Sequence, residues 1–173
     1  GAMGSLRLEK AYRDFGLDID NTDTPFDVGL GFAVALDKPG GFVGRDALLR
    51  RREERAGRPP VRRLVQVFRE APEPLLYHGE PVLRDGAWFG YNRAGAYGHT
   101  LGGAVGLAMV EDEAGLPAEA VDGARLEVDV AGVRYPARAS LRPLYDPHRM
   151  RTKACPGART MWPRPHGTGR ADR

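Results

Sequence analysis

The feature that most limits how this chain can fold is a series of short segments, between residues 61 and 144, in which apolar and polar residues alternate. Alternation with a period of two predicts β-strands that turn one face to a core. Arg63–Phe68 and Arg125–Val130 show the pattern most clearly, and Leu101–Val110 adds a longer apolar stretch. Short strands spaced in this way predict a small antiparallel barrel or sandwich of about six strands.

Two dipeptides in the same region are typical of tight hairpin turns. Asp85-Gly86 divides residues 80–90, and Ala131-Gly132 divides residues 125–139. Two-residue hairpin turns need left-handed backbone, which glycine adopts without steric cost. We therefore expect both segments to form β-hairpins.

The first 60 residues follow a different pattern. Residues 6–16 indicate a strand that runs into a short helix, residues 17–27 a polar loop, and residues 31–37 a further strand. Arg45–Ala56 is the clearest helix in the chain, because Gly57 and a pair of prolines end it and charged residues surround a small apolar side. The architecture expected is mainly β, preceded by a short α/loop segment and one helix.

Both ends of the chain differ in composition from the rest. Gly1–Ser5 resembles the remnant that protease cleavage leaves from an expression vector, so the native chain is expected to extend upstream of Leu6. Residues 154–173 are rich in Pro, Gly and Arg and are expected to be disordered. The single cysteine, Cys155, lies in this stretch and cannot form an internal disulfide.

The distribution of charge argues against a nucleic-acid partner. The formal net charge is +3, and residues 154–173 alone hold four arginines and one aspartate, so residues 1–153 balance at 22 basic and 22 acidic side chains. Nucleic-acid binding usually requires a basic face on the folded domain. Apolar runs also stay well below the roughly 20 residues that span a bilayer. We expect no nucleic-acid partner, no membrane and a cytoplasmic location.

Local motifs for catalysis or metal binding are scarce. The four histidines are scattered, and His99 is expected to make structural hydrogen bonds. Trp88 and Tyr97 are expected in the core of a hairpin. The Asp- and Asn-rich loop 17–27 lacks the glycine and the final glutamate of an EF-hand, which argues against calcium. We therefore assign no catalytic residue and no metal ligand.

A series of segments, taken together, resembles the second half of glycine-cleavage-system T-proteins (aminomethyltransferases) in order and spacing. The segments are Leu6–Tyr12, Gly16–Ile19, Thr24–Phe32 and Phe42–Leu49, followed by Gly79–Gly86, Tyr97–Gly102 and Leu144–Pro147. The last three look closest to the branch of the family that is fused to FAD-dependent dimethylglycine or sarcosine dehydrogenases. An ordered series over residues 6 to about 150 is far more specific than any one motif.

The resemblance implies a fold, cofactors and a division into parts. It implies that residues 6–58 end a folate-binding domain and contain a connecting helix, that residues 59–150 form the C-terminal β-barrel, and that residues 151–173 are a tail. The intact protein is expected to bind tetrahydrofolate and to carry FAD in a separate N-terminal domain. It would oxidise a small N-methyl amine and pass the one-carbon unit to folate, with the barrel capping the folate site.

Three residues are carried over as candidates for folate binding. Glu9 matches the family's Arg-x-Glu glutamate, whose carboxylate can accept paired N–H bonds from a pterin edge. The alternative is a structural role, in which Glu9 forms an ion pair with Arg7 or Arg13. Tyr12 is expected beside the pterin, and its alternative is packing in the core. Lys38 is expected near the folate site, and its alternative is a solvated turn.

A second class of function remains open alongside the enzyme. A non-catalytic regulatory or interaction module of the same fold would share all of these motifs. The family's aspartate near folate N5 and the aromatic residues that clamp the pterin have no match in this chain. By itself, this chain is therefore expected to bind folate weakly and to catalyse nothing.

Overall fold

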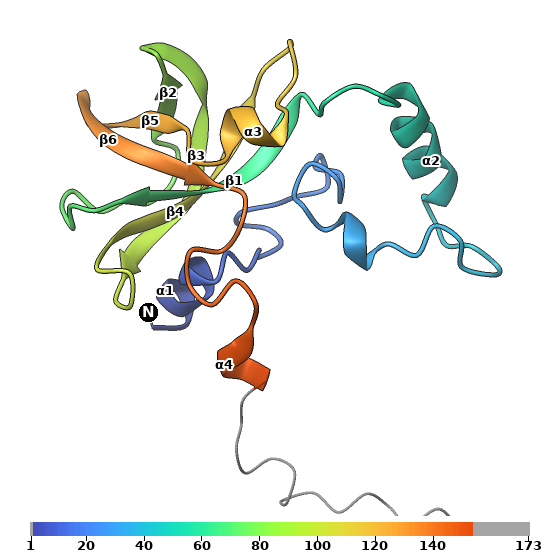
Figure 1. The fold of residues 1–173 in the computed structure, drawn as a ribbon, viewed down its shortest axis with the longest axis horizontal. Helices are drawn as coiled ribbons and strands as arrows, with labels where there is room; N and C mark the ends of the chain where they lie inside the picture. Colours follow the sequence, from blue (N-terminus) through green and yellow to red (C-terminus); the bar gives the residue numbers. More distant parts are fainter. Residues whose placement is uncertain (1, 154–173) are drawn as a thin grey trace, which may run out of the picture.

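Six antiparallel strands close into a barrel in the computed structural model, which describes residues 2–153 (Figure 1). The strands are β1 (Arg62–Arg69), β2 (Pro81–Arg84), β3 (Ala87–Gly98), β4 (Gly103–Glu111), β5 (Arg125–Val130) and β6 (Val133–Ser140). Their order around the barrel is β1-β4-β3-β2-β5-β6. The prediction of a mainly β fold built on a small antiparallel barrel is confirmed.

Both predicted hairpins form at the expected turns. Asp85 and Gly86 join β2 to β3 with φ of 53° and 77°, and Ala131 and Gly132 join β5 to β6 with φ of 54° and 86°. Both central residues of each turn are left-handed, which is the backbone of a type I′ hairpin. These turns set the register of two of the barrel's strand pairs.

The barrel buries side chains on its inside and also beneath the N-terminal segment. Val65 and Val67 of β1 and Ala104 and Ala108 of β4 belong to the inner core. Alternate positions of β4, such as Leu107, pack outward against a second cluster that includes residues of the N-terminal segment. Because β4 is buried on both faces, it reads as a nearly continuous apolar run rather than as a half-buried strand.

The N-terminal helix α1 (Ala2–Glu9) covers the outer face of β3 and β4. Residues 6–16 were predicted as a strand running into a helix that ends at Gly16, and this was wrong: Leu8 lies in a helix that packs onto the barrel and ends at Glu9, and residues 10–16 are not helical. Ser5, within the stretch read as a vector remnant, is buried and donates to the carbonyl of Tyr97 at 2.6 Å. The residues before Leu6 therefore take part in the fold.

Gln66 of β1 joins three parts of the chain. Its Nε2 donates to the carbonyls of Leu8 and Glu9 at 2.7 and 3.1 Å, and its Oε1 accepts from the backbone N–H of Leu144 at 2.8 Å. The side chain is almost fully buried. It therefore holds the end of α1 and the segment that follows β6 against the same strand.

Ion pairs hold the loop that follows α1. Arg7 donates to both oxygens of the buried Asp18, and Arg93 and Arg62 reach Asp23 at 3.0 and 3.1 Å. Asp18 and Asp23 are thus held by arginines. Among residues 2–153, moreover, no group of three or more His, Cys, Asp or Glu side chains is placed to hold a metal ion.

A long connection carries helix α2 (Arg45–Glu54) away from the barrel (Figure 1). The predicted helix is confirmed, and none of its residues is buried. The strand predicted for residues 31–37 was wrong, because Gly31–Ala33 forms a 3₁₀ turn, η1, and no neighbouring strand pairs with the rest. An isolated apolar run cannot form a strand without a partner for its backbone groups.

Single residues also depart from expectation. Trp88 was expected in the hairpin core, and this was wrong, because it is 58% exposed on β3. His99 is exposed and packs edge-on against the ring of Tyr97 at 5.0 Å, and no hydrogen bond from its ring to another described residue is found.

Two short helices complete the described chain. α3 (Ala118–Val121) precedes β5, and α4 (Met150–Lys153) ends the described residues. No helix among the described residues is long and apolar enough to cross a membrane. The predicted disorder of residues 154–173, and the reading of Cys155 as an incidental thiol, lie outside the described residues.

Candidate functional site

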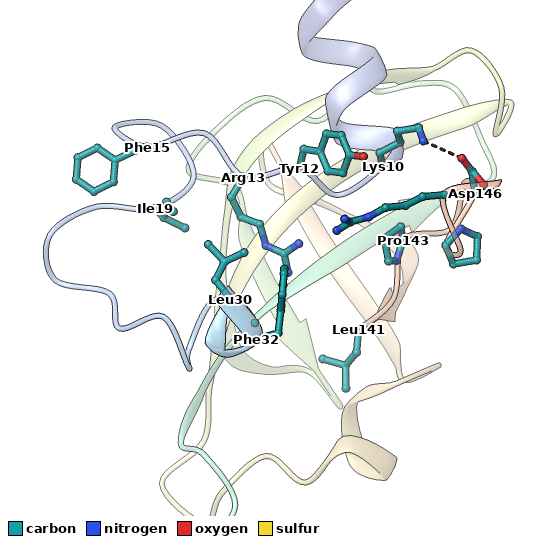
Figure 2. A pocket seen from close by; sticks show the side chains of 13 residues that line it. Lys10, Tyr12, Arg13, Phe15, Ile19, Leu30, Phe32, Leu141, Pro143 and Asp146 are labelled. Carbon is teal, nitrogen blue, oxygen red and sulfur yellow. Dashed lines mark hydrogen bonds and ion pairs between the residues drawn. The ribbon is translucent and has the colours of Figure 1, made fainter. Parts of the chain in front are cut away.

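A pocket of about 450 Å³ lies between the chain that leaves α1 and the chain that follows β6 (Figure 2). Its walls come from segments more than 100 residues apart in sequence. The lining residues are Lys10, Tyr12, Arg13, Phe15, Ile19, Gly29, Leu30, Phe32, Leu141, Pro143, Asp146, Pro147 and Arg149. We call this the junction pocket.

The end of α1 positions the first wall of the pocket. Ala11 adopts φ of 50° and is buried, so the chain turns sharply immediately after the helix. Lys10 and Tyr12 flank this turn and both reach the pocket. The backbone is fixed there, since the N–H groups of Ala11 and Tyr12 donate to the carbonyls of Leu8 and Arg7.

One ion pair connects the two walls of the pocket. Lys10 Nζ donates to Asp146 Oδ2 at 2.9 Å (Figure 2). The same Nζ lies 5.8 and 5.7 Å from the ring centres of Tyr12 and Tyr145. The hydrogen bond from Lys10 lowers the pKa of Asp146 and raises the pKa of Lys10. Both groups are therefore charged near neutral pH, and the pair links the two ends of the described chain.

The pocket combines aromatic faces with a basic wall. Phe15 and Phe32 are 72% and 77% exposed, and Tyr12 is 42% exposed. Arg13 is held by the carbonyls of Val28 and Ala11 at 3.0 and 2.7 Å, and burial lowers the pKa of its guanidinium, partly offset by Asp18. Such a site suits a flat ring that carries an anionic group, because rings stack on the aromatic faces and arginine attracts the anion.

Glu9 points away from this pocket and into the protein. It is fully buried, and its carboxylate accepts hydrogen bonds from Thr100 N, Leu101 N and Thr100 Oγ1 at 2.6, 3.0 and 3.1 Å. The alternative of an ion pair with Arg7 or Arg13 is not observed, since Arg7 pairs with Asp18 and Asp14. Glu9 thus fastens α1 to the loop between β3 and β4.

The other two candidates lie apart from one another. Tyr12 lines the junction pocket, next to Lys10 and Arg13. Lys38 is exposed in the turn between η1 and α2 and is not part of the pocket wall. The fold therefore brings Tyr12, but neither Lys38 nor the carboxylate of Glu9, to this pocket.

Sequence reasoning missed most of the pocket's polar residues. Lys10 follows Glu9 directly, and Asp146 lies in the Leu144–Pro147 motif, so both stood in segments already singled out. Their pairing spans 136 positions, and only the closed barrel brings them together. No local pattern could have indicated it.

Two family models match the chain. Residues 62–146 match the glycine cleavage T-protein C-terminal barrel domain, and residues 1–38 match the GCVT N-terminal domain. The first match covers the six strands and the Asp146 that closes the pocket. The chain belongs to the glycine cleavage T-protein family. The predicted resemblance is confirmed at this level.

Proteins similar to this T-protein family member include an oxidase and several aminomethyltransferases. A 4-methylaminobutanoate oxidase (formaldehyde-forming) from Paenarthrobacter nicotinovorans is 44% identical over 84% of this chain and 16% of its own length. An aminomethyltransferase from Synechococcus sp. (strain CC9311) is 37% identical over 84% of this chain and 37% of its own length. The chain therefore spans well under half the length of these relatives.

The fold is also similar to a solved structure. Glycine cleavage system aminomethyltransferase T from Bartonella henselae superposes with a TM-score of 0.66 and 25% identity, over 82% of this chain and 37% of that one. In this T-protein family member, the junction pocket thus lies where the barrel domain meets the matched end of the GCVT N-terminal domain.

Proposed function

We propose that this chain is the C-terminal part of a folate-dependent enzyme that oxidises a small N-methyl amine, with the barrel capping the folate site. The observation that carries the proposal is the junction pocket, which joins exposed aromatic rings to a basic wall where the two matched family domains meet. Folates combine a flat pterin, a benzoyl ring and carboxylates, and those chemical groups fit such a wall.

The residues present allow a specific division of roles. Tyr12 would lie against a ring of the folate, and Arg13 would attract a carboxylate. Lys10 is paired with Asp146, so it would position Tyr12 and the following segment rather than bind the ligand itself. When bound, tetrahydrofolate would supply a nucleophilic amine that takes up the one-carbon unit.

Glu9 and Lys38 take less direct roles in this proposal. A direct bond from Glu9 to a pterin would require its carboxylate to leave Thr100 and Leu101, because both of its oxygens are occupied and buried. We therefore infer that Glu9 holds the end of α1 from behind. Lys38 would approach the ligand only through the connection between η1 and α2, and this remains a prediction.

The similar oxidase supports a proposal for the substrate and the second cofactor. That relative's name describes an N-methylated amino acid as substrate and formaldehyde as product. We propose an amine of the same class here, of which dimethylglycine and sarcosine are the smallest examples. Oxidation of such an amine requires a redox cofactor, and we propose FAD held by a separate domain of a cytoplasmic enzyme. The rest of the parent chain would then be the barrel's main partner.

The proposal is tested by calorimetric titration of 5-formyltetrahydrofolate into this chain and into a version extended upstream by the rest of the GCVT N-terminal domain. We expect saturable binding to the extended version, and about fivefold weaker binding after Tyr12→Ala, since a stacked aromatic contributes on the order of 1 kcal/mol. Tyr77→Ala is the matched control, because Tyr77 is 65% exposed and lies outside the pocket. Lys38→Ala tests the remaining candidate.

Two results would count against this reading. Absence of binding to the extended protein would remove the folate function while leaving the family assignment intact. Equal loss on Tyr12→Ala and Tyr77→Ala would place the ligand elsewhere. If the extended protein binds no folate, a non-catalytic interaction module that docks through the exposed helix α2 would become the better account.

A further inference from the structure

The barrel wall opens between the ends of β1 and β6, on a face separate from the junction pocket. The β1–β6 ladder contains only Gln66↔Ser140, Val67↔Ala139 and Phe68↔Arg138, and beyond Phe68 the two strands part. Pro136 cannot donate a ladder hydrogen bond, so β6 cannot continue the pairing at that residue. A groove of about 720 Å³ opens there.

Arginines concentrate along this groove. Arg125 of β5 lies directly opposite Arg138 of β6, and like charges in a cross-strand pair repel. Neither side chain has an acidic partner within 4 Å among residues 2–153. The fold thus places the Cα atoms of two arginines opposite one another, and neither guanidinium is paired with the glutamates that also line the groove, Glu70 and Glu73.

A third arginine is buried at the end of the groove. Arg69 is 3% exposed, and its Nη1 and Nη2 donate to the carbonyls of Pro74 and Glu73 at 2.6 and 3.1 Å. Its Nε has no partner among the described residues. Burial lowers the pKa of Arg69, and Tyr135 acts in the opposite direction without outweighing it. The hydrogen-bond acceptors of Arg69 are neutral carbonyls, and no carboxylate among residues 2–153 forms an ion pair with it.

Apolar surface completes the groove. The ring of Tyr135 lies under the guanidinium of Arg69 at 4.5 Å, and the ring of Phe68 lies under Arg138 at 5.3 Å. Leu126 and Ala137 form part of the lining, as they pair across β5 and β6. Glu70 and Glu73 stand at the rim and are exposed.

We propose that this groove binds a small organic anion with a flat apolar body, such as an aryl carboxylate. The carboxylate would lie between Arg125 and Arg138, where it relieves the repulsion of the cross-strand pair and accepts charge-assisted hydrogen bonds. The flat body would lie against Tyr135 and Pro136, which line the groove and are not buried. The site is independent of the folate proposal, because it shares no residue with the junction pocket.

The experiment titrates 2-naphthoate, and its neutral counterpart 2-naphthamide, into the 173-residue chain and follows backbone amide shifts by NMR. We expect saturable shifts at residues 68–71 and at the N–H groups of Tyr135, Ala137 and Arg138 for naphthoate, with 2-naphthamide binding at least about tenfold more weakly. Binding of naphthoate should weaken between about 0.05 and about 0.3 M NaCl, because salt screens an exposed charge pair. Arg138→Gln and Arg125→Gln should each weaken it about fivefold or more.

Two variants make the test specific. Arg134→Gln is the matched control, because Arg134 is an exposed arginine four positions along β6 and is outside the groove. Tyr12→Ala reports on binding in the junction pocket instead. Equal affinity for naphthoate and naphthamide, no saturable binding, or a loss caused by Tyr12→Ala but not by the groove variants would each overturn the proposal. If one arginine variant fails to fold, the other carries the comparison.

Discussion

Among single residues, Glu9 shows how a buried carboxylate is held without a cation. Three donors from Thr100 and Leu101 surround it, and two of them are backbone N–H groups. Buried donors left without a partner cost about 1–3 kcal/mol each. We expect Glu9→Ala to lower the free energy of unfolding by about 3 kcal/mol, measured by urea denaturation with no ligand present.

The control for this prediction is Glu70→Ala, since Glu70 is exposed just after β1. A loss for Glu9→Ala with no change for Glu70→Ala would support a structural role that precedes any ligand. An unchanged unfolding midpoint for Glu9→Ala would mean that water accepts the hydrogen bonds of the 98–102 loop in place of Glu9.

A second effect at the residue scale concerns two glycines, one closely packed and one with open space around it. A Cβ on Gly95 of β3 would clash with the backbone of Leu76, whereas a Cβ on Gly4 of α1 meets nothing within 4 Å. We expect Gly95→Ala to destabilise the fold by about 2–3 kcal/mol through overpacking. Gly4→Ala should be neutral or stabilise by up to about 1 kcal/mol, because alanine favours helix. Thermal denaturation of both variants, run side by side, would contradict this account if the two shifts had the same sign.

At the scale of elements, we expect local stability to be low in α2 and high in β4. No residue of α2 is buried, whereas eight of the nine residues of β4 are. Local opening is easy where few apolar contacts would be lost. In hydrogen exchange we expect α2 amides to exchange at least about 100-fold faster than those of β4. Comparable protection of the two elements in this chain would show that α2 packs against something.

At the scale of the whole molecule, the ends of the described chain are joined by an acid-sensitive contact. The pKa of Asp146 is lowered below its ordinary value of 3.8 by the hydrogen bond from Lys10. The pKa of Asp27 is lowered as well. Burial alone would raise this pKa, but hydrogen bonds from Arg55 and Thr24 outweigh that effect. A lowered folded-state pKa adds stability that is present above 3.8 and is lost as the pH falls through the folded value.

The contribution of Lys10 to stability depends on pH with the opposite sign. Its pKa is raised above 10.5 by Asp146, so its contribution is present below 10.5 and is lost as the pH rises through the folded value. We expect stability to fall as the pH drops below about 3.8, and the fall to be shallower in Asp146→Asn. Urea unfolding at several pH values measures this, with the exposed Asp37→Asn as control. An identical pH dependence for Asp146→Asn and the unchanged protein would contradict the assignment.

Local patterns in the sequence were enough to predict much of the barrel. Period-two alternation marked the strands, and Asp85-Gly86 and Ala131-Gly132 marked two turns, because those signals act within a few residues. The helix at residues 45–54 was equally readable from its capping and breaking residues. The ordered motifs indicated the family before any geometry was known.

The same reasoning failed where a distant partner decides the outcome. Residues 31–37 look like a strand but find no strand to pair with, and Trp88 looks like core but lies on the outside of the hairpin. A strand and a buried face both depend on what lies opposite, which a local pattern does not contain.

What the sequence by itself determined is the set of strands, the turns, the exposed helix and the family. What only the tertiary structure decided is which side chains meet: Glu9 with the 98–102 loop, Lys10 with Asp146, and Arg125 beside Arg138. Spacing along the chain governs local backbone choice, because those interactions span a few residues. The pockets depend on closing a barrel whose first and last strands are more than 60 residues apart, and only long-range pairing sets that register.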